Sequence, residues 1–137
     1  GATGNIHTNF DGKAAAASEA LRGDTDFLYV HLEAPHACGH QGHLKDKIRA
    51  MELIDQKVVG PIRAGLEASG EQYRMLVLPD HPTPISLRTH VGDPVPYVLF
   101  DSSRAGGETD QRFSEVSGKS TGNFFSSGPE LVRYFLS

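Results

Sequence analysis

Leu78-Pro-Asp-His-Pro-Thr-Pro-Ile-Ser-Leu-Arg-Thr-His90 is the most informative stretch of the chain. It begins where the apolar run Met75–Leu78 ends, and its first polar residues are an adjacent carboxylate and imidazole, Asp80 and His81. Prolines crowd these positions, and a second imidazole, His90, closes the stretch. An apolar strand does not need an Asp-His pair at its end, whereas metal and acid/base sites need such groups held on a stiff element. The stretch therefore predicts a strand that ends at a chemical site.

A second group of possible ligands lies upstream, in Glu33-Ala-Pro-His36-Ala-Cys-Gly-His40-Gln-Gly-His43. Its Gly and His content predicts a loop or a short irregular turn over 36–43, and Glu33 suits a strand end or an ion pair. If this segment forms one helical turn, its three imidazoles share a face. Two or three of them could bind one divalent ion together with His90. Because nitrogen donors dominate, the set favours Zn, Mn or Co over Ca.

Other residues could complete such a site. Asp80 and His81 could bind the same ion or a second one, and two ions about 3.5–4 Å apart can hold the entering and leaving oxygens of a phosphoryl transfer. Lys13 and Arg88 could pair with phosphate oxygens. Each assignment has a plainer alternative: a solvated surface residue, or, for Asp80, a side chain that caps a turn. Cys38 could be a ligand or nucleophile, although most lone cysteines are inert apolar groups.

Composition narrows the class of protein. The 137 residues suggest one domain, and 22% charged with 38% hydrophobic residues suits a packed core. A net charge of −4 argues against a nucleic-acid surface, and no apolar stretch reaches the roughly 18 residues of a membrane span. The single cysteine fits a reducing, cytoplasmic compartment. The start at Gly1-Ala-Thr-Gly4 predicts a fragment of a longer protein, and this motif is a weak candidate for a phosphate cradle.

The pattern of apolar residues predicts an α/β fold. The expected elements are helix 10–22, strand 26–33, helix 44–68 with a bend at Gly60-Pro61, strands 73–78 and 96–101, a loop over 102–123 and a terminal helix over 129–136. Strand–helix–strand order implies a right-handed parallel crossover. In parallel sheets, binding sites lie at the carboxyl ends of the strands, which is where both histidine groups occur.

Several runs of the sequence resemble a known family, the cofactor-independent phosphoglycerate mutases of the archaeal type, within the alkaline phosphatase superfamily. The matching runs are Gly1-Ala-Thr-Gly4, Thr8-Asn-Phe-Asp-Gly-Lys13, Val30-His-Leu-Glu-Ala-Pro35, Gly39-His40-Gln-Gly42, the 78–90 stretch and Asp93-Pro-Val-Pro96. The similarity covers most of residues 1–101, and its most specific part is Pro-Asp-His-Pro-Thr-Pro. Residues 102–137 match only loosely.

The resemblance implies a fold and a reaction. The fold is a three-layer alkaline-phosphatase-like sandwich with a mostly parallel sheet, of which residues 1–137 are the C-terminal part of a metal-dependent phosphotransferase domain. The reaction interconverts 3-phosphoglycerate and 2-phosphoglycerate through a phosphoserine, with two divalent metal ions (Mn, Zn, Co or Mg). The implied partner is therefore a small phosphorylated glycerate, with no nucleic acid or membrane involved. A homo-oligomer is possible.

The resemblance also implies roles for individual residues. Asp80 and His81 would bind the ion that activates the nucleophile, and His40 and His90 the other ion. Lys13 resembles the family's lysine beside the nucleophile and the transferring phosphate. Independently of the resemblance, Arg88 is a candidate for substrate binding because its guanidinium could pair with phosphate oxygens.

Two departures from the family pattern matter. His36 stands where the family has an Asp, which removes a negative charge and favours softer ions. The family's serine nucleophile and a further metal-binding Asp lie in an N-terminal segment that this chain lacks, so the fragment alone is expected to be inactive. Its exposed sheet edge is expected to allow self-association. The alternatives are a related phosphoesterase or phosphonate-processing enzyme, and a non-catalytic metal-binding fragment.

Overall fold

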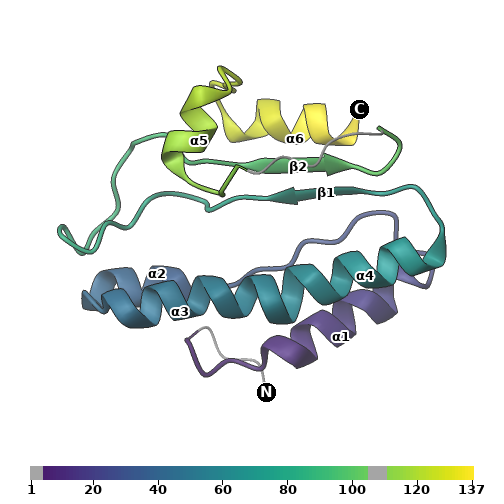
Figure 1. Cartoon of the computed structure of the whole chain (residues 1–137), viewed down its shortest axis with the longest axis horizontal. Coiled ribbons are helices and arrows are strands. Elements are labelled where there is room, and N and C mark those ends of the chain that lie inside the picture. Colours follow the sequence, from purple (N-terminus) through teal and green to yellow (C-terminus); the bar gives the residue numbers. More distant parts are fainter. Residues whose placement is uncertain (1–4, 105–110) are drawn as a thin grey trace. The chain divides into compact units, whose positions relative to one another are not determined.

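The computed structural model describes residues 5–104 and 111–137 (Figure 1). The chain divides into two compact units, and each is described by itself. The first unit comprises Gly1–Glu71 with Thr83–Val91, and the second comprises Gln72–Pro82 with Gly92–Ser137. The Gly1-Ala-Thr-Gly4 motif, predicted as a weak phosphate cradle, lies outside the described residues.

Helix α1 of the first unit spans Phe10–Leu21, as the sequence predicts. It begins at Asn9, whose side-chain oxygen accepts a hydrogen bond from the backbone N–H of Gly12 at 2.8 Å. Its buried side chains are Phe10, Ala14 and Ala17. Because two of the three are alanines, the neighbouring helix can approach closely.

The predicted long helix 44–68 is present as three continuous segments: α3 (Leu44–Ile54), the π-helical η1 (Asp55–Val59) and α4 (Gly60–Ser69). Pro61 explains the π turn. Proline has no N–H and its ring collides with the carbonyl four residues earlier, so the helix widens just before it. Val58 and Ile62 are buried where η1 and α4 contact α1.

Helix α2 (Ala34–Gln41) corrects the prediction of a loop over 36–43. Pro35 lies in the first turn, where its missing N–H costs nothing, and Gly42 ends the helix with a left-handed φ of 73°. Proline at the start and glycine at the end are helix boundary signals. A prediction based only on the Gly and His content of the segment does not use them. The helix packs against α3 (Figure 1).

Residues 26–33 do not form the predicted strand among the residues described. From Phe27 onwards exposure does alternate in the way a strand's would, with Phe27 54% and Tyr29 73% exposed and Leu28 and Val30 half-buried. A strand also needs a neighbour that completes its backbone hydrogen bonds. Here, the carbonyl of His31 accepts instead from the side-chain amine of Lys13, at 2.8 Å.

The second unit contains a two-stranded sheet of β1 (Arg74–Val77) and β2 (Val98–Asp101). The strands lie at the predicted positions, but they pair antiparallel, with Arg74 opposite Asp101 and Val77 opposite Val98. The described part of the chain shows this antiparallel pair and does not show the predicted mostly parallel sheet. The predicted parallel crossover requires residues 26–33 to pair with β1, and this pairing is not seen among the described residues, so the mostly parallel sheet stays a prediction.

Two short helices accompany this sheet in the second unit. Helix α5 (Glu115–Ser120) lies within the segment predicted as loop, and α6 (Gly128–Leu136) is the predicted terminal helix. Each starts at a serine whose side chain caps the first turn, and for α5 this local signal corrects the prediction of a loop. The guanidinium of Arg74 binds Asp101 at 3.0 Å and donates to the carbonyl of Phe135 at 3.1 Å, which joins β1 to α6.

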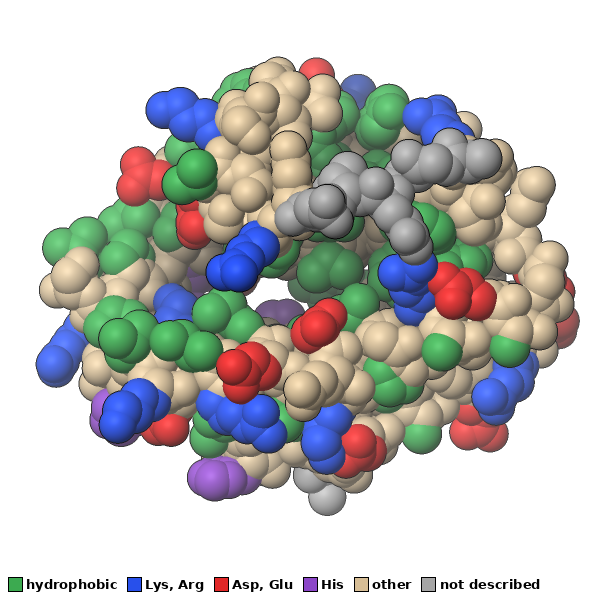
Figure 2. Space-filling view, in the orientation of Figure 1, with side chains coloured by type: hydrophobic (Ala, Val, Ile, Leu, Met, Phe, Trp, Pro, Cys, Tyr) green, Lys and Arg blue, Asp and Glu red, His purple; other side chains and the backbone are tan. Residues whose placement is uncertain are grey.

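The helices of the first unit carry acidic and basic side chains interspersed over their exposed faces (Figure 2). Examples are the one-turn pairs Arg49–Glu52 at 3.1 Å and Arg63–Glu67 at 2.7 Å. Such pairs stabilise an exposed helix by a few tenths of a kcal/mol at most and are typical of a solvated surface. Among the described residues, no helix combines the length and the apolar character needed to cross a bilayer.

Candidate metal centre

Helix α2 places two imidazoles on one face. His36 and His40 are four residues apart, so they lie one turn above the other. Their ring centroids are 4.6 Å apart and the rings meet edge to face at 76°. His43, predicted to share this face, lies beyond the left-handed Gly42 and turns instead towards Asp46, with 3.5 Å between Nδ1 and Oδ2.

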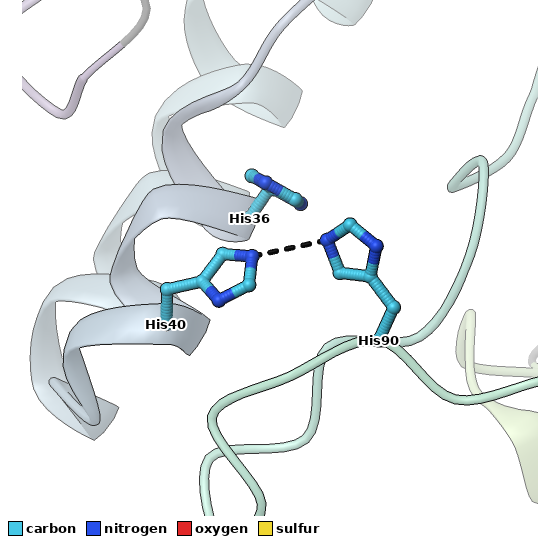
Figure 3. A group of neighbouring side chains, drawn as sticks. All are labelled: His36, His40 and His90. Atoms are coloured by element: carbon cyan, nitrogen blue, oxygen red, sulfur yellow. Dashed lines mark hydrogen bonds between the residues drawn. The ribbon is translucent and has the colours of Figure 1, made fainter.

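His90 completes a cluster of three imidazoles in the first unit (Figure 3). The ligand atoms of His36, His40 and His90 all lie within 4.8 Å of one another. The Nε2 atoms of His40 and His90 are 3.0 Å apart. His36 is half-buried while His40 and His90 are exposed, so the cluster is open on one side.

A backbone carbonyl orients the ring of His40. Its Nδ1 lies 2.9 Å from the carbonyl oxygen of Arg88. Because a carbonyl oxygen only accepts, this contact places the proton of the neutral ring on Nδ1 and leaves the Nε2 lone pair facing His90. A backbone carbonyl behind a histidine is a common support of metal-binding imidazoles.

Arg88 supplies that carbonyl from an unusual backbone conformation, with a φ of 53°. Non-glycine residues seldom adopt positive φ, which is a small strain that the surroundings must stabilise. The guanidinium lies over Gly42, where a Cβ would come within 2.7 Å of Nε. The main chain of Arg88 therefore has a structural role, and substrate binding by its side chain stays a prediction.

Segment 83–91 is attached to α2 at Thr83, which is 4% exposed. The carbonyl of Thr83 accepts a hydrogen bond of 2.6 Å from the side-chain amine of Lys47, and its hydroxyl lies 3.4 Å from Nδ1 of His36. Gly39 faces this carbonyl, and a Cβ there would approach it to 2.6 Å. Sequence reasoning missed Thr83, Lys47 and Gly39, and nothing in local spacing could have joined residues so far apart in the chain.

The donor set fits a divalent transition metal. Nitrogens bound to one zinc ion at about 2.1 Å lie at most about 4.2 Å apart. The His40–His90 pair is within this limit. No two ligand atoms of the cluster are more than 4.8 Å apart, so the side chains would have to move together by less than about 1 Å to bind one ion. The exposed side leaves room for further ligands such as water or a phosphate oxygen.

Asp80 and His81 follow β1 in the second unit. One carboxylate oxygen of Asp80 accepts from the backbone N–H of His81 at 2.9 Å, and the other lies 3.3 Å from its Nε2. The first contact is the turn-capping role considered as an alternative for Asp80. The side chain of Asp80 is 64% exposed and that of His81 28%. Their assignment as metal ligands stays a prediction.

The remaining candidates occupy different surroundings in the first unit. Lys13 is half-buried and borders an open hollow of about 280 Å³ between α1 and residues 28–31. Glu33 pairs with His31 at 3.2 Å, as expected of an ion-pair residue. Cys38 is buried. Burial is the main cause that raises the pKa of its thiol, and the negative charge of Asp46 is the second. A buried thiol with a raised pKa is a poor nucleophile.

Comparison with known proteins identifies the family. A family model described as the metalloenzyme superfamily matches residues 1–136. The 2,3-bisphosphoglycerate-independent phosphoglycerate mutase of Methanothrix thermoacetophila is 48% identical over 99% of this chain and 34% of its own length. The probable enzyme of the same name in Geobacter sulfurreducens is 46% identical over the same shares.

A solved structure, that of the PH0037 protein from Pyrococcus horikoshii, matches with a TM-score of 0.74 at 31% identity. The match covers 88% of this chain and 35% of that one. The chain thus spans about a third of the length of the curated relatives it matches. It belongs to the metalloenzyme superfamily and is homologous to one portion of the archaeal-type 2,3-bisphosphoglycerate-independent phosphoglycerate mutases, as its motifs predicted.

Proposed function

We propose that these residues form the C-terminal part of a metal-dependent phosphoglycerate mutase, which interconverts 3-phosphoglycerate and 2-phosphoglycerate through a phosphoserine. The observation that carries the proposal is the cluster of His36, His40 and His90, which a family of metalloenzymes would use to hold an ion. As an enzyme of glycolysis it would work in the cytoplasm. Its small-molecule partner would be the phosphorylated glycerate. We also propose that the protein can associate with copies of itself.

The proposed fold of the longer protein is the three-layer sandwich with a mostly parallel sheet. Residues 27–33 support this, because they are non-helical, their exposure alternates as a strand's does, and such a segment can pair with a further strand through its backbone. The two edges of the β1–β2 pair can accept strands in the same way. Residues 1–137 would be one part of this domain.

The proposed site uses two divalent ions, Mn, Zn, Co or Mg. His36, His40 and His90 would hold one of them, and Asp80 and His81 would hold the other. Bound metal supplies charge stabilisation to a transferring phosphoryl group and activates the attacking hydroxyl.

The chain's own groups would orient the substrate. Lys13 would contact the phosphate through its amine, after leaving the carbonyl of His31. Arg88 would hold His40 through its carbonyl and offer its guanidinium, a planar donor suited to phosphate and carboxylate oxygens, to the substrate. On their own, the 137 residues are proposed to be inactive, because the phosphoserine is expected outside them.

The test uses the full-length protein that contains these residues. It is incubated with 3-phosphoglycerate and each of Mn²⁺, Zn²⁺, Co²⁺ and Mg²⁺, without added bisphosphoglycerate, and phosphorus NMR follows the two isomers. We expect the 2-isomer to form, and His40→Ala to abolish it, whereas His7→Ala, at an exposed histidine outside the cluster, leaves the rate unchanged. No isomerisation with any of the four ions would refute the mutase assignment.

A panel of other phosphate esters and phosphonates in the same assay separates the mutase from a related phosphoesterase. Faster turnover of any of these than of phosphoglycerate would favour the phosphoesterase. Metal binding without any turnover in the full-length protein would favour a non-catalytic metal-binding role.

A further inference from the structure

The three-histidine cluster has a donor set of one kind. Each of its members offers an imidazole nitrogen, and the grouping found among the described residues contains no carboxylate. Imidazole suits zinc, copper and nickel, whereas carboxylate and water suit magnesium, calcium and manganese. Three histidines with an open fourth position are the ligand set of several catalytic zinc sites. We propose that this cluster is a zinc-class site and that His36 is the residue that sets its selectivity against Mn²⁺ and Mg²⁺.

Charge around the cluster points the same way. Neutral imidazoles leave the full charge of a bound ion uncompensated, and two basic side chains beside α2 add to it. The amine of Lys47 would lie 3.1 Å from a Cβ at Gly39, the residue before His40. The guanidinium of Arg88 lies over Gly42, two residues after His40. A hard ion that depends on carboxylate charge is disfavoured here, whereas zinc gains from its stronger bonds to nitrogen.

Among the three histidines, His36 is the one whose Nδ1 lies beside a side chain of the neighbouring segment, 3.4 Å from the hydroxyl of Thr83. His40 is fixed by the Arg88 carbonyl, and His90 faces His40 at 3.0 Å. His36 reaches the cluster from one helical turn earlier, and its half-buried ring lies 4.6 Å from that of His40 and 5.0 Å from that of His90. An aspartate at this position would present oxygen to the same face of α2. The choice of imidazole here therefore determines whether the site is all-nitrogen or mixed.

This inference rests on the metal-binding part of the proposed function and not on the mutase reaction. Its test uses the whole 137-residue chain, freed of metal by chelation. Affinities for Zn²⁺ and Mn²⁺ are measured by competition with a chromophoric chelator, and the Co²⁺ complex is examined by visible absorption. We expect Zn²⁺ to be preferred, and Co²⁺ to show the intense absorption of tetrahedral coordination.

Most nitrogen and oxygen sites prefer zinc to manganese, so the decisive quantity is how the preference changes with His36. His36→Asp should reduce the Zn²⁺-to-Mn²⁺ affinity ratio by at least about tenfold. His7→Asp, which makes the same change at an exposed histidine outside the cluster, should leave the ratio unchanged. Circular dichroism verifies that both variants keep their helices.

The outcomes separate the two proposals. An unchanged ratio in a folded His36→Asp variant would overturn the selectivity inference and leave the metal centre standing. A weak, octahedral Co²⁺ spectrum in the unmodified chain would overturn it as well, without relying on any variant. No binding of any divalent ion, or binding that His40→Ala leaves intact, would refute the metal centre itself.

Discussion

Replacing Gly39 by alanine should destabilise the protein, although helix propensity alone predicts the opposite. Alanine in place of glycine inside a helix gains about 1 kcal/mol. At Gly39, however, the new Cβ would lie 2.6 Å from the Thr83 carbonyl oxygen and 3.0 Å from its Cγ2. The first contact is with backbone, so segment 83–91 must move away from α2.

The cost can be set against the gain. Overpacking of this kind costs about 1–3 kcal/mol. The hydrogen bond from Lys47 to the Thr83 carbonyl, 2.6 Å long, is weakened by the same movement, and bonds to charged groups contribute about 1.5–3 kcal/mol. We therefore expect a net loss of about 1–2 kcal/mol in the free energy of unfolding.

Gly65→Ala is the matched control. Gly65 lies in α4, its Cβ would have nothing within 4 Å, and alanine there should stabilise by about 0.5–1 kcal/mol. Urea unfolding followed by circular dichroism measures both variants. Opposite signs are expected, and Gly39→Ala should also weaken metal binding because His90 moves with Thr83. Equal stabilisation by both substitutions would refute the close approach of Thr83 to α2.

Three further predictions concern stability and reactivity. Hydrogen bonds from Ser103 lower the pKa of Asp101 in the folded chain, so ionised Asp101 stabilises the fold at pH values above its ordinary pKa of 3.8. The free energy of unfolding, measured against Asp101→Asn, should lose this contribution as the pH falls through the lowered pKa. A difference between the two proteins that does not change with pH would contradict this. Ile62→Ala, at a side chain 8% exposed, should cost about 2–5 kcal/mol in urea unfolding, whereas Ile48→Ala, 45% exposed, should cost under about 0.5. Cys38 should react with a thiol reagent slowly in the native chain and rapidly in urea; equal rates would show that it is accessible.

Local sequence patterns determined most of the helices and the positions of two strands. Apolar side chains three or four residues apart mark the helix from residue 44, and Gly60-Pro61 marks the place near which its hydrogen bonding changes. The same patterns failed for α2, where Pro35 and Gly42 were stronger signals than overall composition. They failed at residues 26–33 because a strand depends on a partner that no local pattern reveals.

The sequence by itself determined which residues could bind a metal and to which family the chain belongs, because motifs and helical spacing are local properties. Only the tertiary structure decided that His36 and His40 meet His90, about fifty residues away along the chain. That meeting depends on a turn at Arg88 with positive φ and on a contact between Gly39 and Thr83. Contacts between distant segments form only when packing repays the entropy of closing the loop, and this balance is a property of the folded chain.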